Sequence, residues 1–546
     1  MTRPARPAPL PVLVVAGTHS GCGKTTAALA LMAALTRRGL RVQPMKAGPD
    51  YIDPGLHAAV TGRPGWNLDG WMCGPEGVRR SFARAVATPT PPDIAVIEGV
   101  MGLHDGASAD GPQGSTAEVA ALLHAPVLLV ADVRGMSRSA AALVAGYTRF
   151  DPALRFAGVV CNRVGGPGHR ALLRRALAAH CPETPLLGLL SRDESLGLPS
   201  RHLGLAQAHE QAAWPELSAR LADWFEAGLD AAGQSLDGLL ALCEAMAAAS
   251  PEHGAGKPAD AAAPEDAATP SPQAPAHAST VTLGPVGTAA TAATGLSEGA
   301  PLRNRIGIAR DAAFSFLYPE NLFLLEAAGA EPAFFSPLSD AALPPDIGGL
   351  LLPGGYPELH AARLAANAPM LAAVRAFAAL GRPVHGECGG FMYLLRSITD
   401  AAGTRHSMTG CLPAACRMDA RLRALGYREA QTLRPSPFGP AGTVVRGHEF
   451  HYSHLDPAVP TGLAGAAETA TAADADRPPL STLAMWSLRD RNGVPLGPEG
   501  LCAGSVSGTY VHLHFGSNPA VARAFVAACA ASAPIFAPAH GDGSCP

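Results

Sequence analysis

A glycine-rich run near the N-terminus contains residue types that hold phosphate groups in proteins. It reads GTHSGCGKTT from Gly17 to Thr26, between an apolar run at 12–16 and a helix-like segment that continues to about Arg38. Glycines let backbone N–H groups turn inward around an anion, and the start of a helix adds partial positive charge. This order of strand, glycine loop and helix predicts a phosphate-binding loop; a glycine-rich turn without a nucleotide is the alternative.

Particular residues of the loop have expected roles in binding ATP. The Lys24 ammonium should reach the terminal phosphates, and the Thr25 hydroxyl should ligate Mg²⁺. The first glycine stands one residue earlier than the strict spacing of such loops requires, a form that resembles the loop of dethiobiotin synthetase-like P-loop amidoligases. The other expected ATP contacts in the loop are Gly21, Gly23 and Thr26.

A polar loop at 46–57 follows an expected strand at 41–45 and reads KAGPDYIDPGLH. Open α/β sheets bind their ligands in loops at the carboxyl ends of the strands. Asp50 and Asp53 are therefore candidates for contacts with Mg²⁺ or with a substrate. A surface turn would have a similar composition.

Two later strand ends in the first half also carry polar side chains. The expected strand at 94–97 leads to Glu98, which we predict to be the second anchor of the metal, and Asp105 in the following loop is a further carboxylate candidate. The expected strand at 158–161 ends at Asn162. The Asn162 amide could form paired hydrogen bonds with the edge of the adenine ring. Alternatively, it could be a buried amide that caps a helix.

A second chemical pattern surrounds Cys388 in the other half of the chain. Residues 383–391 read PVHGECGGF, so glycines flank the cysteine at the spacing of a nucleophile elbow, a strained turn between a strand and a helix. The start of the helix should lower the thiol pKa and favour the thiolate. Backbone N–H groups of Gly389 and Gly355 could stabilise a tetrahedral oxyanion. A buried structural cysteine is the alternative.

A nucleophilic thiol of this kind needs a general base, and several histidines are available. The segment 508–515, GTYVHLHF, alternates like a strand and places His512 and His514 on the same face. His451 is a third candidate. The residue pattern favours His512 and leaves the other two open.

Strand and helix patterns alternate through both halves. In the first half, expected helices at 115–123 and 137–147 flank a strand at 127–131, which favours βαβ units and a mostly parallel sheet. The second half begins a new series at 305–309, with another strand near 331–335. The predicted fold class is α/β in both halves.

Composition limits the class of protein. The chain has 546 residues, of which 48% are hydrophobic and 16% charged, which is typical of globular proteins with roughly two to four domains at this length. The net charge of −4 argues against a general nucleic-acid binder. The eleven cysteines are scattered without a C-x-x-C pair, which indicates neither a zinc site nor a disulfide framework. We expect a cytoplasmic protein with neither a signal peptide nor a membrane span.

A change in composition divides the chain near its middle. From about 246 to 300, Ala, Pro, Thr, Gly and Ser dominate and large apolar residues are few. Such a stretch cannot bury enough apolar surface to offset its chain entropy, so we expect a disordered tether. The predicted organisation is a first domain at 1–245, a linker at 246–301, a second domain at 302–535 and a tail at 536–546.

Taken together, these motifs resemble a P-loop amidoligase joined to a class I glutaminase-like domain. With the loop at 46–57, the chain is similar to the cobyrinic (or hydrogenobyrinic) acid a,c-diamide synthase family of cobalamin biosynthesis. Three further runs agree with this family: EGVMGLHDG at 98–106, GLPSRHLGL at 197–205 and FHYS at 450–453. The resemblance covers both halves and leaves out the N-terminal tip, the linker and the tail.

The resemblance implies a ligase with two linked reactions on a P-loop parallel-sheet domain and a flavodoxin-like glutaminase domain. ATP with Mg²⁺ would phosphorylate a corrin acetate group, and ammonia from glutamine would displace the phosphate, giving the c and a amides in turn. Cys388 would be the glutaminase nucleophile, and His512 would raise its nucleophilicity. No orienting carboxylate is named, because the residue two positions after His512 is His514.

The expected ligand contacts extend beyond the loop. The expected metal ligands are Thr25, Asp50 and Glu98, the expected ATP contacts include Asn162, and the expected substrate contacts are Asp50, Tyr51, Asp53, His57 and Asp105. The expected partners are a corrin polycarboxylate and glutamine, without nucleic acid or membrane, and the chain is compatible with a homodimer. Ammonia should pass between the sites through a closed interface, because ammonia released into solvent at neutral pH becomes protonated to ammonium, which is not nucleophilic.

Other functions fit parts of the pattern. A nickel-sirohydrochlorin a,c-diamide synthase would perform the same chemistry on a similar macrocycle. Cobyric acid synthase shares both domains but lacks the run GPDYIDP found at 48–54. A P-loop switch or scaffold with an inactive glutaminase-like domain is the alternative from another class; His19 argues against it, because partition-type ATPases carry a second lysine there.

Overall fold

A computed structural model describes residues 9–196, 200–201, 204–205, 214–249, 304–456 and 483–532. The described residues of both halves belong to one compact unit. Nearly all of the expected linker, the whole expected tail and parts of the 197–205 run lie outside the described residues. The domain boundaries therefore stay predictions, although each half has its own central sheet.

The first half is built on a seven-stranded sheet in the order β3-β2-β4-β1-β5-β6-β7, and all of its pairings are parallel. The strands are β1 Val12–Gly17, β2 Val42–Ala47, β3 Trp66–Leu68, β4 Ile94–Glu98, β5 Val127–Asp132, β6 Phe156–Val164 and β7 Leu186–Ser191. The helices are α1 Lys24–Arg37, α2 Ile52–Thr61, α3 Gly70–Val86, α4 Thr116–Leu122, α5 Arg138–Phe150, α6 Pro167–His180, α7 Trp214–Ala232 and α8 Leu236–Ala248. A short turn, η1 Glu194–Leu196, and a hairpin of β8 Ser200–Arg201 and β9 Gly204–Leu205 follow β7.

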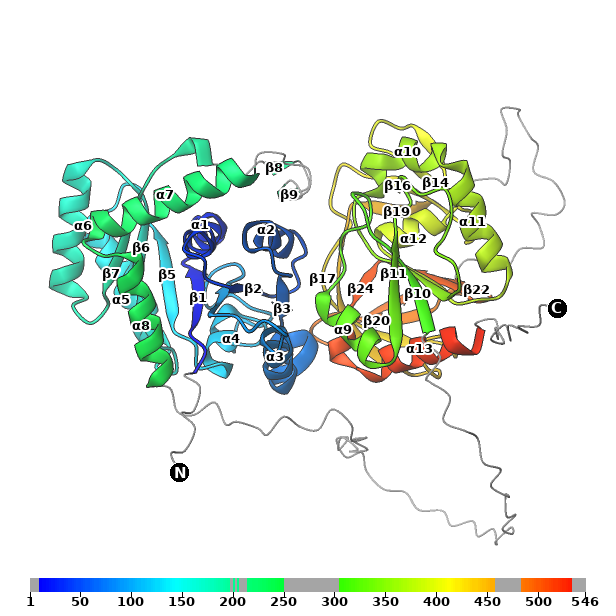
Figure 1. Cartoon of the computed structure of the whole chain (residues 1–546), viewed down its shortest axis with the longest axis horizontal. Coiled ribbons are helices and arrows are strands. Elements are labelled where there is room, and N and C mark those ends of the chain that lie inside the picture. The colour runs from blue at the N-terminus through cyan, green and yellow to red at the C-terminus, as the bar shows by residue number, and fades with distance from the viewer. Residues whose placement is uncertain are drawn as a thin grey trace, which may run out of the picture. The chain divides into compact units, whose positions relative to one another are not determined.

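Helices cover both faces of this sheet, which explains why its strands read as continuous apolar runs. Leu13 and Val15 of β1 pack in the core with α1, α2 and α7, whereas Val14 packs in the core with α3 and α4. Figure 1 shows these two sets of helices on opposite sides of the sheet. The expected strands and helices of this half are confirmed.

The second half contains a six-stranded sheet in the order β11-β10-β12-β13-β23-β22, parallel except for the last pairing. Its strands are β10 Asn304–Ala309, β11 Ala330–Phe335, β12 Ile347–Leu352, β13 Val384–Glu387, β22 Leu501–Ala503 and β23 Val506–Thr509. The five parallel strands follow the 2-1-3-4-5 order of flavodoxin-like sheets, so the predicted fold is confirmed. The helices are α9 Pro319–Ala327, α10 Ala361–Ala366, α11 Ala368–Ala379, α12 Gly389–Leu394 and α13 Ala520–Ser532, with short turns η3 Pro357–His360 and η6 Phe515–Ser517.

Two smaller sheets complete the second half. A five-stranded antiparallel sheet contains β17 Ala424–Thr432, β18 Val444–His451, β20 Trp486–Arg489, β21 Pro495–Glu499 and β24 Val511–Leu513. A four-stranded sheet contains β14 Ser397–Thr399, β15 Arg405–Ser407, β16 Ala415–Met418 and β19 Ser453–Asp456. The single strand expected at 508–515 is divided, because β23 joins the parallel sheet and β24 joins the antiparallel one.

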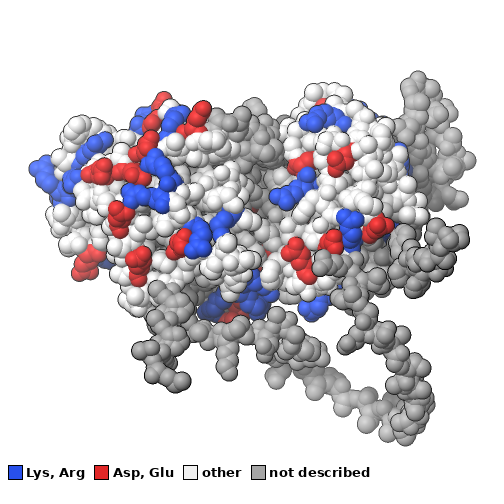
Figure 2. All heavy atoms as spheres, in the orientation of Figure 1, with Lys and Arg blue, Asp and Glu red and all other residues white. Residues whose placement is uncertain are grey.

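Surface charges of both signs lie among one another on the face shown in Figure 2. Ion pairs join many of them: Arg37 contacts Asp223 and Glu226, and Arg38 contacts Asp237. Because exposed pairs contribute little to stability, the fold depends mainly on its apolar cores.

A substitution at Phe438 tests the core between the parallel and antiparallel sheets. This ring is 1% exposed and stacks on Phe525 with centroids 5.3 Å apart. We expect Phe438→Ala to lower the free energy of unfolding by about 3–5 kcal/mol, because it leaves a cavity in a packed core. Urea denaturation followed by fluorescence would measure this. The control Leu380→Ala, at a side chain that is 67% exposed, should change the free energy of unfolding by less than about 0.5 kcal/mol. Equal effects of the two substitutions would contradict the placement of Phe438 in the core.

Candidate functional site

The loop after β1 has the backbone conformation expected of a phosphate-binding loop. Gly21 and Gly23 adopt left-handed φ values of 81° and 95°, and α1 begins at Lys24. A Cβ at Gly23 would lie 2.1 Å from the Asn162 amide nitrogen, so only glycine fits there. That amide donates a hydrogen bond of 2.9 Å to the Cys22 carbonyl. Asn162 therefore holds the loop at the start of α1, and its contact with adenine stays a prediction.

Glu98 lies at the centre of the site beside this loop. Its carboxylate is fully buried and accepts hydrogen bonds from Thr25 Oγ1 at 2.6 Å and Lys46 Nζ at 3.0 Å, while His57 Nε2 lies 2.6 Å from its other oxygen. Sheet register explains this convergence, because β4 lies between β1 and β2 and Glu98 is directly opposite Lys46. Burial would raise the pKa of Glu98, but the charge of Lys46 and the hydrogen bond from His57 outweigh it and hold the pKa well below its ordinary value.

The loop at 46–57 adds two further carboxyl groups. Lys46 Nζ donates a hydrogen bond to Asp53, and Asp50 Oδ1 accepts one of 2.8 Å from the backbone N–H of Ile52. Burial and the neighbouring charges of Asp50 and Glu98 raise the pKa of Asp53 well above its ordinary value, against the effect of Lys46. An added cation would offset the like charges of Asp50 and Glu98 that raise the pKa of Asp53.

These oxygens suit Mg²⁺, which prefers carboxylates, hydroxyls and phosphates as ligands. The Thr25 hydroxyl and the Glu98 carboxylate are in direct contact, as two neighbouring ligands of one ion would be. Asp105 instead accepts a hydrogen bond of 2.9 Å from Gly102 within its own loop. Asn67, which the sequence did not single out, donates to the carbonyls of Gly48 and Asp50 and fixes the shape of the loop at 46–57.

Cys388 occupies a strained turn between β13 and α12. Its φ of 44° and ψ of −101° are unusual for a residue with a side chain, and its backbone N–H donates a hydrogen bond of 2.7 Å to Thr509 of the neighbouring strand. The flanking glycines permit the turn: a Cβ at Gly390 would lie 1.9 Å from the Leu352 carbonyl oxygen, and one at Gly386 would lie 2.6 Å from the Gly390 backbone. The nucleophile-elbow geometry predicted from the glycine spacing is present.

The two expected oxyanion donors lie next to each other. A Cβ built on Gly389 would be 3.0 Å from the backbone nitrogen of Gly355, so the turn after β12 packs directly on the start of α12. A Cβ at Gly355 would meet the Ala313 carbonyl at 2.1 Å, so this position too accepts only glycine. The arrangement can place two N–H groups near one oxygen of a bound substrate.

Of the three candidate bases, His512 has the surroundings that fit. Its ring lies beside the same glycine turn, where a Cβ on Gly354 would be 2.1 Å from His512 Cε1, and among described residues its Nδ1 has no hydrogen-bond partner. His451 contacts Ser453 O at 2.7 Å with one nitrogen and Glu449 at 2.8 Å with the other. The nitrogens of His514 face Cys73 and Glu320 instead, as described below.

Burial keeps both the thiol and the imidazole neutral in this structure. It raises the pKa of Cys388 well above its ordinary value, with a further contribution from nearby carboxylates such as Glu358, and it lowers the pKa of His512 to about 3. The expectation that the helix start lowers the thiol pKa is therefore wrong for the free protein. Helix α12 has six residues, and the hydrogen bond from Gly389 offsets only part of the desolvation.

Tyr51 connects the loop at 46–57 with this second set of residues. Its ring lies 4.8 Å from the His512 ring, 4.4 Å from Tyr318 and 5.3 Å from Phe316, centroid to centroid. A cavity of about 770 Å³ opens beside it. Residues from both halves line the cavity, among them Asp50, Val100, Tyr427, Arg428, His448 and Phe450. The motif analysis assigned no ligand contact to the second-half members, because they are separated from the loop by hundreds of residues.

Comparisons with known proteins identify both halves of the chain. Residues 13–205 match the CobQ/CobB/MinD/ParA nucleotide binding domain, and residues 305–520 match the CobB/CobQ-like glutamine amidotransferase domain. The chain is 46% identical over 522 residues to a cobyrinate a,c-diamide synthase of Syntrophotalea carbinolica, covering 95% of this chain and 98% of that protein. The chain belongs to the a,c-diamide synthase family. The resemblance inferred from its motifs is confirmed.

Two further a,c-diamide synthases show the same full-length match. A hydrogenobyrinate a,c-diamide synthase of Streptomyces coelicolor is 41% identical over 529 residues, which cover 96% of this chain and 98% of that one. A cobyrinate a,c-diamide synthase of Salmonella typhimurium is 38% identical over 519 residues, which cover 94% and 97%. None of the described helices of this family member is long and apolar enough to cross a membrane.

The raised thiol pKa predicts how Cys388 reacts with an alkylating agent. A thiol with an ordinary pKa of about 8.5 is mostly ionised at pH 9, so its reaction rate begins to level off there, whereas the rate of a thiol with a higher pKa keeps rising. We therefore expect the rate of iodoacetamide labelling at Cys388 to rise about tenfold per pH unit from pH 7 to 9 without a plateau, because the thiolate is the reactive form. Peptide mass spectrometry resolves this site from the other cysteines, and glutathione is the control. A plateau below pH 8 would show a stabilised thiolate and contradict the expectation.

Proposed function

We propose that this protein uses ATP, Mg²⁺ and glutamine to amidate the a and c acetate side chains of cobyrinic or hydrogenobyrinic acid in cobalamin biosynthesis. The full-length match to a,c-diamide synthases supports the substrate class. One observation carries the linked chemistry: Tyr51, from the loop that holds the carboxylates, contacts His512 beside the cysteine elbow. The expected cytoplasmic location and homodimer stay predictions.

The first half would activate a corrin acetate group. Lys24 and the backbone N–H groups of the loop would hold the ATP phosphates, while Thr25, Glu98 and Asp50 would supply oxygens for Mg²⁺, whose charge would offset that of the phosphates. The acetate oxygen attacks the γ-phosphorus, the bond from this phosphorus to the bridging oxygen breaks, and ADP leaves. Lys46 balances the buried charge of Glu98 and donates a hydrogen bond to Asp53, and so keeps their oxygens in place.

The second half would release ammonia from glutamine. When glutamine fills the site, Cys388 passes its proton to His512, and the thiolate attacks the amide carbon. The N–H groups of Gly389 and Gly355 stabilise the oxyanion, and His512 returns the proton to the departing ammonia. Water then hydrolyses the thioester, which frees glutamate and restores the thiol.

Ammonia would reach the acyl phosphate through the interior of the protein. Its nitrogen attacks the acyl carbon, the carbon–oxygen bond to phosphate breaks, and inorganic phosphate leaves with the amide formed. The ring contacts of Tyr51 and the cavity beside Asp50 support a short route between the two sites. A route of this kind keeps ammonia unprotonated and therefore nucleophilic.

A pair of variants tests the division of labour. Cys388→Ala should keep amidation with ammonium salts and lose it with glutamine, because only the glutaminase reaction needs the thiol. Lys24→Ala should lose both activities, by about 10²-fold or more, because transition-state charge on the phosphates is no longer balanced. Mass spectrometry of the corrin product counts the amides, and circular dichroism checks the fold. Loss of the ammonium-dependent reaction in folded Cys388→Ala would contradict the assignment.

The same assay identifies the macrocycle. Cobyrinic acid, hydrogenobyrinic acid and nickel-sirohydrochlorin are offered separately with ATP and glutamine. Diamide formation from one of the first two supports the proposal. Diamide formation from nickel-sirohydrochlorin alone, or from none of the three, overturns it.

An isotope experiment tests the internal route for ammonia. Unlabelled glutamine is supplied together with ¹⁵N-ammonium below the level that supports turnover by itself. We expect the amide nitrogen to come from glutamine, because ammonia crosses to the acyl phosphate before it mixes with solvent. Full equilibration of the label into the product would show that ammonia is released first.

A further inference from the structure

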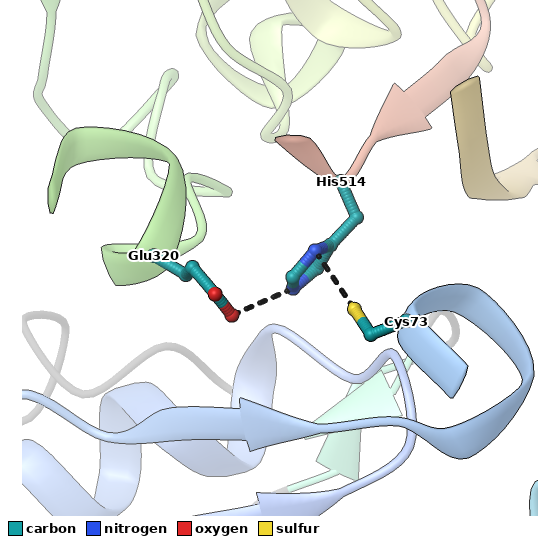
Figure 3. Close-up of side chains that lie close together, drawn as sticks. All are labelled: Cys73, Glu320 and His514. Carbon is teal, nitrogen blue, oxygen red and sulfur yellow. Dashed lines mark hydrogen bonds and ion pairs between the residues drawn. The ribbon is translucent and has the colours of Figure 1, made fainter. Parts of the chain in front are cut away.

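A thiol, an imidazole and a carboxylate outside the sites described above come together at one point. Cys73 lies on α3, Glu320 on α9, and His514 directly follows β24. Figure 3 shows the imidazole of His514 directed between the other two side chains. Cys73 Sγ lies 3.4 Å from His514 Nδ1, and Glu320 Oε2 lies 3.9 Å from His514 Nε2.

The surroundings hold two of these side chains in place. Ser81 Oγ and the Arg84 guanidinium donate hydrogen bonds to the Glu320 carboxylate. The next residue, Asn321, donates a bond of 2.7 Å to Leu513 O and accepts one of 2.8 Å from Phe515 N, on either side of His514. Glu320 and His514 are 3% and 1% exposed. Neighbouring side chains therefore hold the carboxylate and the imidazole near each other before any ligand arrives.

We propose that Cys73, His514 and Glu320 form a binding site for a divalent transition-metal ion, with Zn²⁺ as the best fit. Thiolate, imidazole and carboxylate are the protein ligands that zinc accepts, and three of them with a water complete a tetrahedron. Magnesium and calcium prefer oxygen ligands throughout, so this donor set disfavours them.

The distances are compatible with such an ion. One ligand atom from each residue lies within 4.8 Å of the others. In a tetrahedral zinc site with bonds of about 2.0–2.3 Å, the ligand atoms lie about 3.3–3.7 Å apart, so the three side chains need shifts of about 1 Å to close on the ion. The distance of 3.4 Å between Cys73 Sγ and His514 Nδ1 already has this value. Because one ion binds only one ring nitrogen, Glu320 Oε2, which lies 3.9 Å from Nε2, has to move toward the Nδ1 side.

The two charged ligands would match the two positive charges of the ion. Binding replaces the proton of the Cys73 thiol, which passes to solvent, and places a thiolate and a carboxylate around Zn²⁺. The Arg84 guanidinium stays on Glu320 as an outer hydrogen-bond donor, in the way that metal-ligating carboxylates are commonly supported. The ion would link α3 of the first half to the segment that carries His512 two residues earlier. The inference does not depend on the proposed amidation.

Zinc titration of the full-length protein tests the site without substrate, ATP or magnesium. Bound metal is first removed from the protein with a chelator. Zinc is then added, and the protein competes for it with a chromophoric chelator of known affinity. We expect one zinc ion per chain in the wild type and at least about a tenfold loss of affinity in Cys73→Ala and in Glu320→Gln. Cys502→Ala, at a half-buried cysteine elsewhere in the second half, is the matched control and should bind as the wild type does.

Cobalt provides a measurement that reports sulfur ligation directly. Co²⁺ in the wild type and in Cys502→Ala should give a thiolate-to-cobalt band in the near ultraviolet, and Cys73→Ala should lose it while keeping its circular dichroism spectrum. A wild-type protein without this band overturns the proposal even if the variants fail to fold. If Cys73→Ala still shows the band, or binds zinc as tightly as the wild type does, the proposal is overturned as well, because the ion would then lie at another site.

Discussion

The buried carboxylate of Glu98 is the interaction on which the rest of the first half depends. It receives hydrogen bonds from the phosphate loop through Thr25, from β2 through Lys46 and from α2 through His57. A carboxylate without these partners would be costly to bury, and Lys46 without Glu98 and Asp53 would be equally costly. The three strands β1, β4 and β2 therefore position one charged cluster, and that cluster fixes the phosphate loop and the loop at 46–57 together.

The same cluster determines what the second half can contact. Lys46 and Asp53 fix both ends of the loop at 46–57, and Tyr51 between them lies against the His512 ring. The cysteine elbow is held by a different constraint, since its positive φ and its crowded glycines require that β12, β13 and β23 keep their register. A change in nucleotide state that moved the loop would be felt at His512. The loop at 46–57 and the residues beside the cysteine elbow are thus joined by packing.

The motifs with strict local geometry were predictable because their chemistry depends on spacing within a few residues. The glycines of the phosphate loop, Glu98 at a strand end and the glycines around Cys388 all lie where the sequence placed them. Two expectations failed for reasons of tertiary environment. The thiol pKa follows burial rather than the short helix, and the segment at 508–515 divides between two sheets because its halves pair with different strands.

By itself, the sequence determined the α/β class, the phosphate loop, the elbow and the family, because each rests on local patterns or on similarity along the chain. Only the tertiary structure placed His512 beside the glycine turn at 354–355, gave His451 and His514 other partners, and connected the halves through Tyr51 and the cavity. It also brought together Cys73, Glu320 and His514, which no C-x-x-C spacing could have indicated. Contacts between residues hundreds of positions apart follow from sheet order and packing, and these do not appear in any short stretch of sequence.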